Sequence, residues 1–248
     1  MCTLAAYVGC APALPLLVAA NRDEFLDRPA AEPRLLAVQP WVVGGQDLSA
    51  GGTWFGVNEH GLVVGLLNRR QPGGPDPRRR SRGLLCLTML QQLSLSAARA
   101  ALAATDGSEV NGFNLLIADR HAALVATNFA GQLAVTELPP GLHLLTNLDL
   151  NDSTCPRIAK SCERFRALDL AAANDPGELL PALQAILADH STALDPRAEV
   201  IDTLCVHLPN YGTRSASIVA VDAAGGLRYW HAPGPPCRTA FGEVALPS

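Results

Sequence analysis

Two short stretches near the amino end, Leu4–Val8 and Leu16–Ala20, are apolar at every position. Side chains alternate between the two faces of a strand, so a strand of this kind has to be covered on both faces. The segment Gly9–Leu14 between them contains Pro12 and predicts a turn. The pair therefore predicts a hairpin inside a layered protein, with other elements packed above and below it.

The rest of the chain supplies elements for such layers. Further strands are expected at Trp41–Gly44, Thr53–Val57, Leu62–Leu67, Phe113–Ala118, Ala122–Thr127, Leu133–Glu137, Leu142–Thr146, Ala216–Asp222 and Leu227–His231. Helices are expected at Leu84–Ala104, in one or two pieces with Ser94 or Ser96 as a cap, from Pro156 after the caps Asp152, Ser153 and Thr154, and at Glu178–Asp189. Most strands are joined by hairpins, which favours antiparallel sheets. We predict one domain over residues 1–248, of class α+β, with two mainly antiparallel sheets packed together and helices outside.

Charge and cysteine usage exclude some classes of protein. The net charge of −4 argues against nucleic-acid binding, which needs a basic field. The seven cysteines include no CxxC and the six histidines are isolated, so the spacing predicts no metal site and mostly core thiols in a reducing cytoplasm. No cofactor is expected, and the oligomeric state is left open.

The apolar start of the chain raises the question of a secretion signal. No Lys or Arg precedes Leu4–Ala20, and Pro12 and Pro15 interrupt it, so we expect no signal peptide. No other segment has the about 18 unbroken apolar residues of a membrane helix. The sequence therefore predicts a cytoplasmic protein without an integral membrane segment.

The second residue is chemically the most suggestive. With the turn centred between Ala11 and Pro12, Cys2 would face Asn21, beside Arg22 and Asp23. Loss of the methionine before a small residue would leave Cys2 with an α-amino group of pKa about 7.7–8.0 next to a thiol of about 8.5. A nucleophile and its general base would then share one residue. The alternative is that Cys2 is only a small apolar strand residue.

Several segments together resemble a known family. They are MCTLAAY, AANRDEFLDRPA, VVGGQDLSAGGTWFGVNEHGLVVGLLNRR, SRG, LLTN and YGTRSASI. On these the chain is identified as a member of the NRDE family, the relatives of transport and Golgi organisation protein 2. That family in turn resembles N-terminal-nucleophile (Ntn) hydrolases of the choloylglycine hydrolase and penicillin V acylase branch, which implies a four-layer αββα fold.

The resemblance also implies site residues. Cys2 corresponds to the nucleophile and Asp23 to the aspartate that binds its α-amino group. Asn68 and Asn147 correspond to residues near the developing oxyanion, and Arg214 to a late active-site arginine. One departure is clear: the acylase branch has an arginine three residues before the aspartate, where this chain has Ala20. Arg22, next to Asp23, is expected on the opposite face of the strand.

Substrate-binding candidates surround these positions. The loop GGQDLSAGG is expected to turn tightly or to form a cleft wall, and Trp54 beside it to line an apolar pocket or fill the core. The Pro-, Gly- and Arg-rich loop near 69–82 starts directly after Asn68. It is either a solvated mobile loop or a device that captures a carboxylate or phosphate by guanidinium groups. Arg22, Trp54 and Arg69 are the residues we expect to touch substrate.

Two functions remain open at this point. The first is a cysteine N-terminal-nucleophile hydrolase that acts on a non-peptide amide or related acyl bond of a small molecule, or a related acyltransferase. The second, implied by the family, is a non-catalytic carrier of haem, lipid or acyl-CoA on the same fold. Cys155 before Pro156 is compatible with a haem-responsive dipeptide or with an ordinary helix start.

Overall fold

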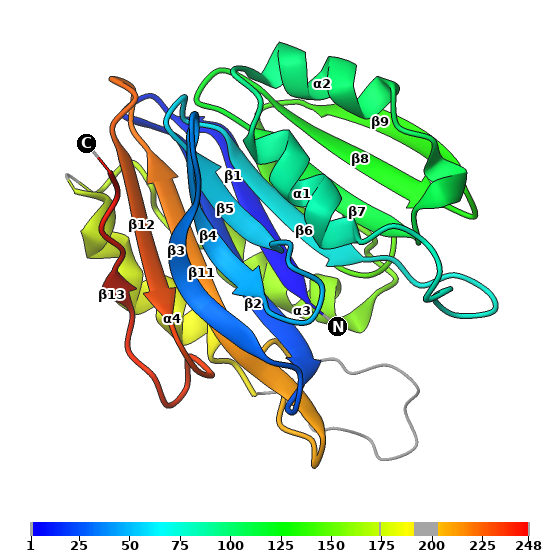
Figure 1. Ribbon diagram of the computed structural model, residues 1–248. Helices are drawn as coiled ribbons and strands as arrows, with labels where there is room; N and C mark the ends of the chain where they lie inside the picture. The colour runs from blue at the N-terminus through cyan, green and yellow to red at the C-terminus, as the bar shows by residue number, and fades with distance from the viewer. Residues whose placement is uncertain (1, 174, 191–202, 248) are drawn as a thin grey trace.

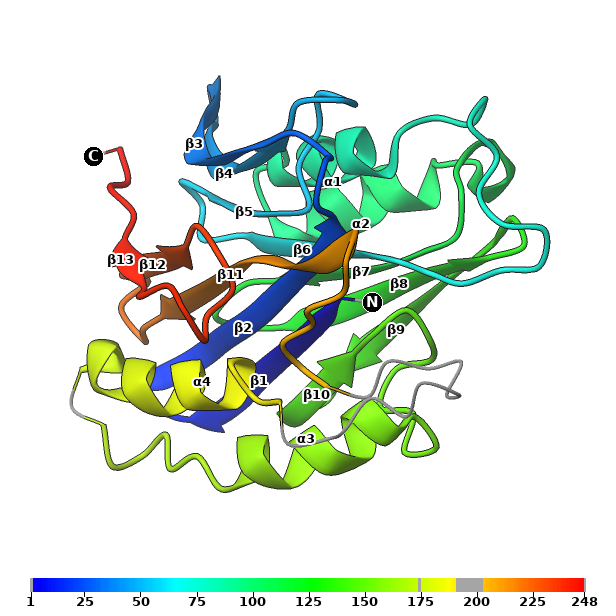
Figure 2. The same ribbon diagram turned by 90° about the horizontal axis from the view of Figure 1, so that it is seen from below.

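The computed structural model describes residues 2–173, 175–190 and 203–247. Within them the chain forms four layers: helices, a sheet, a second sheet and helices (Figures 1 and 2). Every pair of neighbouring strands in these ranges runs antiparallel. The α+β class and the αββα arrangement expected from the sequence are confirmed.

The first sheet contains both double-sided apolar strands at its centre. Its order is β10-β1-β2-β11-β12-β13. The bounds are β1 Thr3–Ala11, β2 Leu14–Phe25, β10 Gly141–Leu145, β11 Tyr211–Val221, β12 Leu227–Ala232 and β13 Gly242–Glu243. Chain segments from both ends of the sequence thus meet here, because β2 pairs with β11 along most of its length.

The second sheet follows sequence order, β3-β4-β5-β6-β7-β8-β9. The bounds are β3 Ala30–Val38, β4 Trp41–Asp47, β5 Phe55–Asn58, β6 Val63–Asn68, β7 Phe113–Ala118, β8 Ala123–Phe129 and β9 Gln132–Leu138. Short turns connect β3 to β4, β5 to β6, β7 to β8 and β8 to β9, whereas residues 69–112 connect β6 to β7. In the turn between β5 and β6, Asn58 Oδ1 accepts hydrogen bonds from the N–H groups of His60 and Leu62.

The helices cover the two outer faces. Their bounds are α1 Arg82–Leu90, α2 Leu95–Ala103, α3 Pro156–Arg166 and α4 Leu180–Leu187, with short 3-10 turns η1 Gly107–Glu109 and η2 Pro176–Leu179. The expected helix over 84–104 is two helices, and Ser94 caps the second by accepting from Ala97 N–H. Ser81 caps α1 in the same way through Leu84 N–H. Hydroxyl caps at both starts explain why one apolar run yields two helices.

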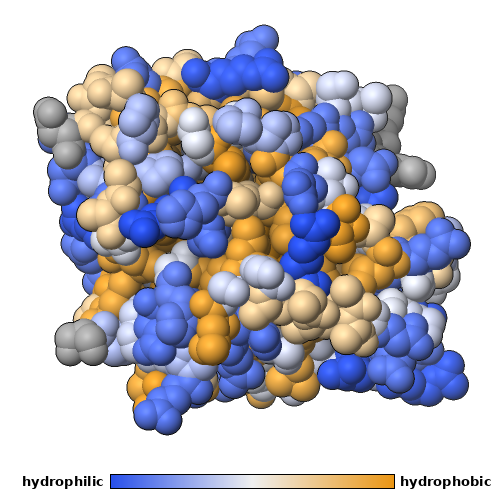
Figure 3. All heavy atoms as spheres, turned by 90° about the horizontal axis from the view of Figure 1, so that it is seen from above, coloured by the Kyte–Doolittle hydropathy of each residue, from blue (hydrophilic) through white to orange (hydrophobic). Residues whose placement is uncertain are grey.

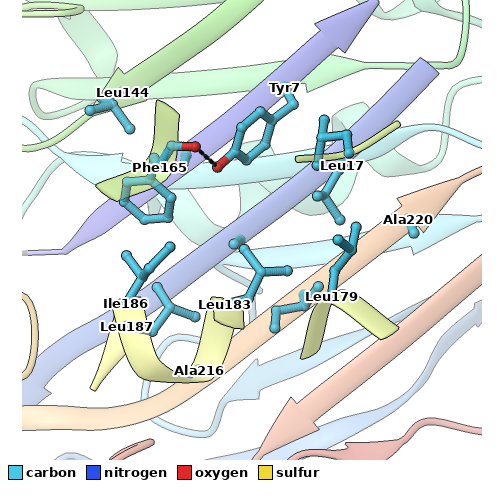
Figure 4. Close-up of a cluster of buried hydrophobic side chains, with 14 of the residues drawn as sticks. Tyr7, Leu17, Leu144, Phe165, Leu179, Leu183, Ile186, Leu187, Ala216 and Ala220 are labelled. Carbon is cyan, nitrogen blue, oxygen red and sulfur yellow. Dashed lines mark hydrogen bonds between the residues drawn. The ribbon is translucent and has the colours of Figure 1, made fainter. Parts of the chain in front are cut away.

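The side chains of β1 alternate between two hydrophobic cores, which explains why both faces of this strand are apolar. Ala5 and Tyr7 belong to the core between the first sheet and helices α3 and α4, where Tyr7 O–H donates to the Phe165 carbonyl at 2.7 Å (Figure 4). Leu4 and Val8 belong to the core between the two sheets. A third core lies between the second sheet and helices α1 and α2. The surface seen from above in Figure 3 mixes apolar and hydrophilic side chains.

Four sequence-based expectations need correction. Thr3, not Cys2, pairs with Asn21, because the β1–β2 turn is offset by a bulge between Val8 and Ala11. Strands β3 and β13 were not expected, since β3 is interrupted by Pro33 and carries little apolar alternation. Cys155 is the N-cap of α3 and makes no side-chain cap hydrogen bond, so the three polar residues before it do not cap. The helix expected over 178–189 spans only Leu180–Leu187, after the 3-10 turn η2.

Candidate active site

The β1–β2 hairpin brings Cys2 against Asp23. The Cys2 thiol donates to the Asp23 carbonyl, with Sγ 3.4 Å from the oxygen, and the Asp23 N–H donates back to Sγ across 3.3 Å. Tyr211 O–H, from the start of β11, donates to the same carbonyl at 3.0 Å. The proximity of Cys2 to the NRDE segment, expected from the hairpin, is therefore present despite the one-residue shift in register.

The Asp23 carboxylate points to the helix-facing side of the sheet. Its Oδ2 accepts from Arg157 of α3 at 3.0 Å, and its Oδ1 accepts from the Thr213 hydroxyl at 2.6 Å. Both charged side chains are 0% exposed. Arg157 also donates to Thr3 Oγ1 at 3.0 Å, which ties the ion pair to β1. A buried pair with hydrogen-bonded partners holds its geometry firmly, because either charge alone would be costly to bury.

Arg22, one residue earlier, points to the inter-sheet side with Cys2. Its guanidinium carbon lies 4.1 Å from the centroid of the Trp54 ring, a cation–π distance. The expected divergence of Arg22 and Asp23 to opposite faces is confirmed. The indole is accommodated because Gly45 has no side chain: a Cβ there would lie 2.4 Å from the ring. Trp54 thus lines the cleft and supports Arg22.

A cleft of about 480 Å³ opens beside the thiol. Expected site residues that line it are Cys2, Arg22, Asp23, Trp54 and Asn68. Asp47 and Ala50 from the glycine-framed loop form part of its wall. The Arg-rich loop contributes Pro75, Asp76, Pro77, Arg79, Arg80, Ser81 and Arg82. The Arg-rich loop therefore lines the same cleft as Cys2.

Hydrogen bonds attach the Arg-rich loop to the segment before β7. Asp76 N–H donates to Asn111 Oδ1 at 2.8 Å, and Asn111 Nδ2 returns a bond of 2.8 Å to the Asp76 carbonyl. Arg80 N–H donates to the Glu109 carbonyl at 2.9 Å. These bonds hold the loop against the segment before β7, and its mobility stays a prediction.

The cleft has a small excess of positive charge, because Arg22, Arg28, Arg79, Arg80 and Arg82 line it together with Asp23, Glu24, Asp47 and Asp76. Arg28 pairs with Asp47 at 2.6 Å, yet within the described residues no carboxylate lies within 4.0 Å of the guanidinium nitrogens of Arg22, Arg79 or Arg82. Burial lowers the pKa of Arg22 and of Arg82 from the ordinary arginine value. Glu24 lies close enough to both groups to oppose this shift, but it forms no ion pair with either of them in the described residues. Partly dehydrated guanidinium groups without a directly paired carboxylate favour an anionic ligand.

Asn68, Asn147 and Arg69 meet at a neighbouring pocket of about 330 Å³. Asn147 Nδ2 donates to the Asn68 carbonyl, and Asn147 Oδ1 is buried without a hydrogen-bond partner among the described residues. An amide nitrogen has two hydrogens, so a second N–H of Asn147 remains for another acceptor. Arg69 donates to the Leu148 carbonyl at 2.7 Å and pairs with Asp149, so it shapes the pocket floor.

Arg214 lines neither of the two cavities, although its charge acts on Arg22. It is the extra residue of a bulge in β11, where Thr213 pairs with Asp23 and Ser215 pairs with Arg22. Its guanidinium donates to the carbonyls of Phe25 and Leu26. The active-site role that the resemblance implies for it stays a prediction.

The surroundings of Cys2 favour the protonated thiol. Burial raises the pKa of Cys2, and the nearby Asp23 carboxylate raises it further. A thiolate therefore forms only if a base takes the proton as the sulfur attacks.

Sequence reasoning missed three residues of this region: Arg157, Thr213 and Ser215. Ser215 lines a cavity of about 20 Å³ beneath Cys2, roughly the space of one water, and its Oγ has no partner in the described residues. Arg157 lies 134 positions from Asp23, and no local pattern marks it. Only Thr213 and Ser215 were signalled, by lying within the YGTRSASI segment.

Two further expectations concern a membrane helix and Cys155. Among the described residues, no helix is long and apolar enough to cross a membrane. Cys155 is 2% exposed and packs in the core beneath α3, which explains it as a helix-start residue.

The fold resembles those of solved amide hydrolases. Penicillin V acylase from Agrobacterium tumefaciens superposes with a TM-score of 0.60 and 13% identity, over 93% of this chain and 82% of the acylase. The Caenorhabditis elegans N-acylethanolamine-hydrolyzing acid amidase orthologue gives 0.56 and 11%, over 98% of this chain and all of that one. At such identities the likeness shows the shared Ntn-hydrolase fold alone.

Closer relatives are found by sequence. The Transport and Golgi organization protein 2 homolog of Bos taurus is 30% identical over 240 residues, covering 86% of this chain and 84% of the relative. The Homo sapiens homolog is 29% identical over 235 residues with the same coverage. The family model described as Transport and Golgi organisation 2 matches residues 1–232. The chain therefore belongs to the Transport and Golgi organisation 2 family.

Proposed function

We propose that the protein is a cysteine N-terminal-nucleophile amidohydrolase whose nucleophile is Cys2 after removal of Met1. The observation that carries this proposal is the placement of Sγ at the wall of a cleft of about 480 Å³, held by the backbone of Asp23. A core thiol needs no such cleft. The fold of two solved amide hydrolases supports the same class of reaction.

The proposed reaction needs no group beyond the first residue and its neighbours. The α-amine of Cys2 takes the thiol proton while sulfur bonds to the substrate carbonyl carbon, which becomes an oxyanion. The remaining N–H of Asn147, near Asn68, stabilises that oxygen, a contribution worth about 2.7–4 kcal/mol for one donor. Collapse breaks the C–N bond and returns the proton to the leaving amine. Water then cleaves the thioester, with the α-amine again as base.

Asp23 is proposed to orient the α-amine. Each carboxylate oxygen accepts more than one hydrogen bond, so the bonds from Thr213 and Arg157 are compatible with an added ammonium donor. The ion pair with Arg157 holds the carboxylate in place. Asp23 would thus set both the sulfur, through its backbone, and the amine, through its side chain.

The charge of the cleft favours an anionic substrate. Arg22, Arg79 and Arg82 line it without a directly paired carboxylate among the described residues, and Trp54 offers an apolar surface beside them. We infer an acyl amide that carries a carboxylate or phosphate within reach of these guanidinium groups. An uncharged analogue would leave the guanidinium groups dehydrated and unpaired, which costs binding energy.

The test compares wild type with Cys2→Ser and Cys2→Ala. Intact mass should show Met1 absent, and a panel of N-acyl amino acids, each with its uncharged amide counterpart, should show turnover only by the wild type and faster turnover of the charged member. Rapid acid quenching should trap an acyl group on Cys2. Cys10→Ala, an exposed thiol, is the matched control and should keep full activity.

Retention of Met1 in the mature protein would contradict the proposal. So would turnover that survives Cys2→Ala. If no amide or ester reacts, but haem or acyl-CoA binds equally to wild type and both Cys2 variants, the carrier function replaces the enzyme.

A further inference from the structure

Four side chains with metal-binding atoms meet on the far side of the first sheet from the Cys2 cleft. His190 follows α4, Cys205 and His207 precede β11, and Cys237 lies in the loop after β12. One ligand atom from each lies within 4.8 Å of the others. Their separation along the chain hid them from the spacing analysis, which predicted no metal site.

The distances fit one tetrahedral ion. Zn–S bonds of about 2.3 Å and Zn–N bonds of about 2.0–2.1 Å imply tetrahedral edges of about 3.8 Å between two sulfurs and about 3.6 Å between sulfur and nitrogen. The Cys205 and Cys237 sulfurs lie 3.6 Å apart. His207 Nε2 lies 3.7 Å from Cys205 Sγ and 3.3 Å from Cys237 Sγ. The two sulfurs and His207 Nε2 therefore form a triangle of about the size expected for one face of a zinc coordination tetrahedron.

The fourth residue has the support that a ligating histidine usually has. His190 Nδ1 donates to the Cys205 carbonyl at 3.0 Å, which holds the ring and leaves Nε2 unprotonated in the neutral tautomer. A hydrogen bond from the second ring nitrogen to a backbone carbonyl is typical of metal-bound histidines. The His190 and His207 rings lie 5.1 Å apart at 41°, so the two nitrogens can converge without stacking.

We propose that His190, Cys205, His207 and Cys237 form a structural Zn²⁺ site of the Cys₂His₂ type. Four protein ligands close the coordination sphere, which distinguishes it from a catalytic zinc. Binding replaces two thiol protons, which leave as H⁺, by two Zn–S bonds, so two thiolates balance the charge of the ion. The exposed imidazoles of His190 and His207 give the ion a path from solvent.

The ion would stabilise the segment that supports Asp23. Val206, between two of the ligands, donates its N–H to Thr213 Oγ1 at 2.9 Å. Thr213 in turn donates to Asp23 Oδ1 at 2.6 Å, and the Leu204 carbonyl accepts from Asn21 Nδ2 at 2.9 Å. Zinc would thus fasten α4, the entry to β11 and the loop after β12 behind the candidate active site.

The experiment uses the full chain, grown with zinc and purified in a non-chelating reductant. Metal analysis after dialysis should find zinc equimolar with protein. His207→Gln and Cys237→Ser should each weaken zinc binding by at least about tenfold, since loss of even a partner of a ligand costs about 10–100-fold. His121→Gln and Cys10→Ser, both exposed and outside the cluster, are the matched controls and should bind like wild type.

Cobalt gives a readout that does not depend on how the variants fold. Wild-type protein stripped of zinc and titrated with Co²⁺ should develop the visible bands of tetrahedral cobalt and a thiolate-to-cobalt charge-transfer band. Zinc content in the wild type no higher than in Cys237→Ser, or a wild-type cobalt spectrum without thiolate charge transfer, would overturn the proposal. A Cys205–Cys237 disulfide that persists in wild-type protein purified with the reductant, seen as a mass lower by two hydrogens, would also overturn it.

Discussion

The two faces of the first sheet use neighbouring residues of β2 for opposite purposes. On the helix-facing side, Asp23 and Arg157 form an ion pair with no exposed surface, and Thr3 and Thr213 each add one hydrogen bond to it. On the inter-sheet side, Arg22 lies over Trp54 beside an open cleft, with no carboxylate partner in the described residues. The helix-facing side therefore pairs its acidic residue within the protein, whereas the inter-sheet side presents an arginine to the cleft. From this difference we expect Asp23 to contribute mainly to stability and Arg22, the preceding residue of β2, mainly to ligand binding.

Removal of one member of the ion pair should have the largest effect. Arg157→Leu leaves the Asp23 carboxylate buried without its cation, and we expect the free energy of unfolding to fall by about 3–5 kcal/mol in urea denaturation. The double variant Arg157→Leu/Asp23→Leu should be less destabilised than the single one, because no lone charge remains. A single variant within about 1 kcal/mol of wild type would show that the helix-facing side does not depend on this pair.

Acid should weaken the inter-sheet side through His231. This side chain is 6% exposed, accepts or donates a hydrogen bond with Ser217 at 3.0 Å, and has its pKa lowered by burial to about 4. The unfolded chain binds the proton near pH 6.5, before the folded protein does, so stability present above pH 6.5 is lost as the pH falls toward 4. The loss should reach about 3 kcal/mol.

Urea denaturation across that range measures the effect of His231. His231→Gln should flatten the slope attributable to this residue, and His121→Gln, exposed in a turn, should leave it unchanged. An identical slope in wild type and His231→Gln would exclude His231 as the acid-sensitive group.

Replacement of Arg22 should affect binding more than stability. Arg22→Leu removes a dehydrated cation from the cleft, and we expect KM for an anionic substrate to rise about 10–100-fold, the size of a hydrogen bond to a charged group. The free energy of unfolding should change by about 1 kcal/mol, the size of the contact with Trp54. Arg99→Leu removes the same charge from exposed α2 and is the control. Equal KM changes in both variants would show that Arg22 contributes only net charge.

The smallest effect is expected at Ser215. Its buried hydroxyl has no partner in the described residues, so Ser215→Ala should change the free energy of unfolding by less than about 1 kcal/mol and in the stabilising direction. Thr213→Val, two residues away, should instead cost about 1–3 kcal/mol because Asp23 and Val206 both lose a partner. A similar decrease in the free energy of unfolding in both variants would contradict the different roles assigned to the two faces of the sheet.

Local patterns predicted most of the fold. The double-sided strands, the hairpin turns and the two-piece helix over 84–104 follow from periodicity and caps, which depend on residues close in sequence. Strand β3 was missed because its pairing with β4 is irregular, with register shifts on both sides of Leu35. Its position is set by the partner strand rather than by its own pattern.

The site was predictable only in part. Cys2 and Asp23 were reached because a hairpin and a family motif both point to them, and Trp54 because it lies beside the glycine-framed loop. Arg157 and the residues around Cys205 were not, since their partners lie far away along the chain and meet only in the folded protein. Long-range charge pairs and ligand sets leave no periodic trace in a single sequence.

The bulge at Arg214 has a consequence for how this strand tolerates change over generations. Because Thr213 and Ser215 pair with Asp23 and Arg22, which face opposite ways, the extra residue reverses the parity of β11 at that point. Substitutions within YGTRS alter single contacts. A one-residue deletion there would instead turn the side chains on one side of the deletion to the opposite face of the sheet. Lineages that keep this site are therefore expected to vary the letters of the segment but to conserve its length.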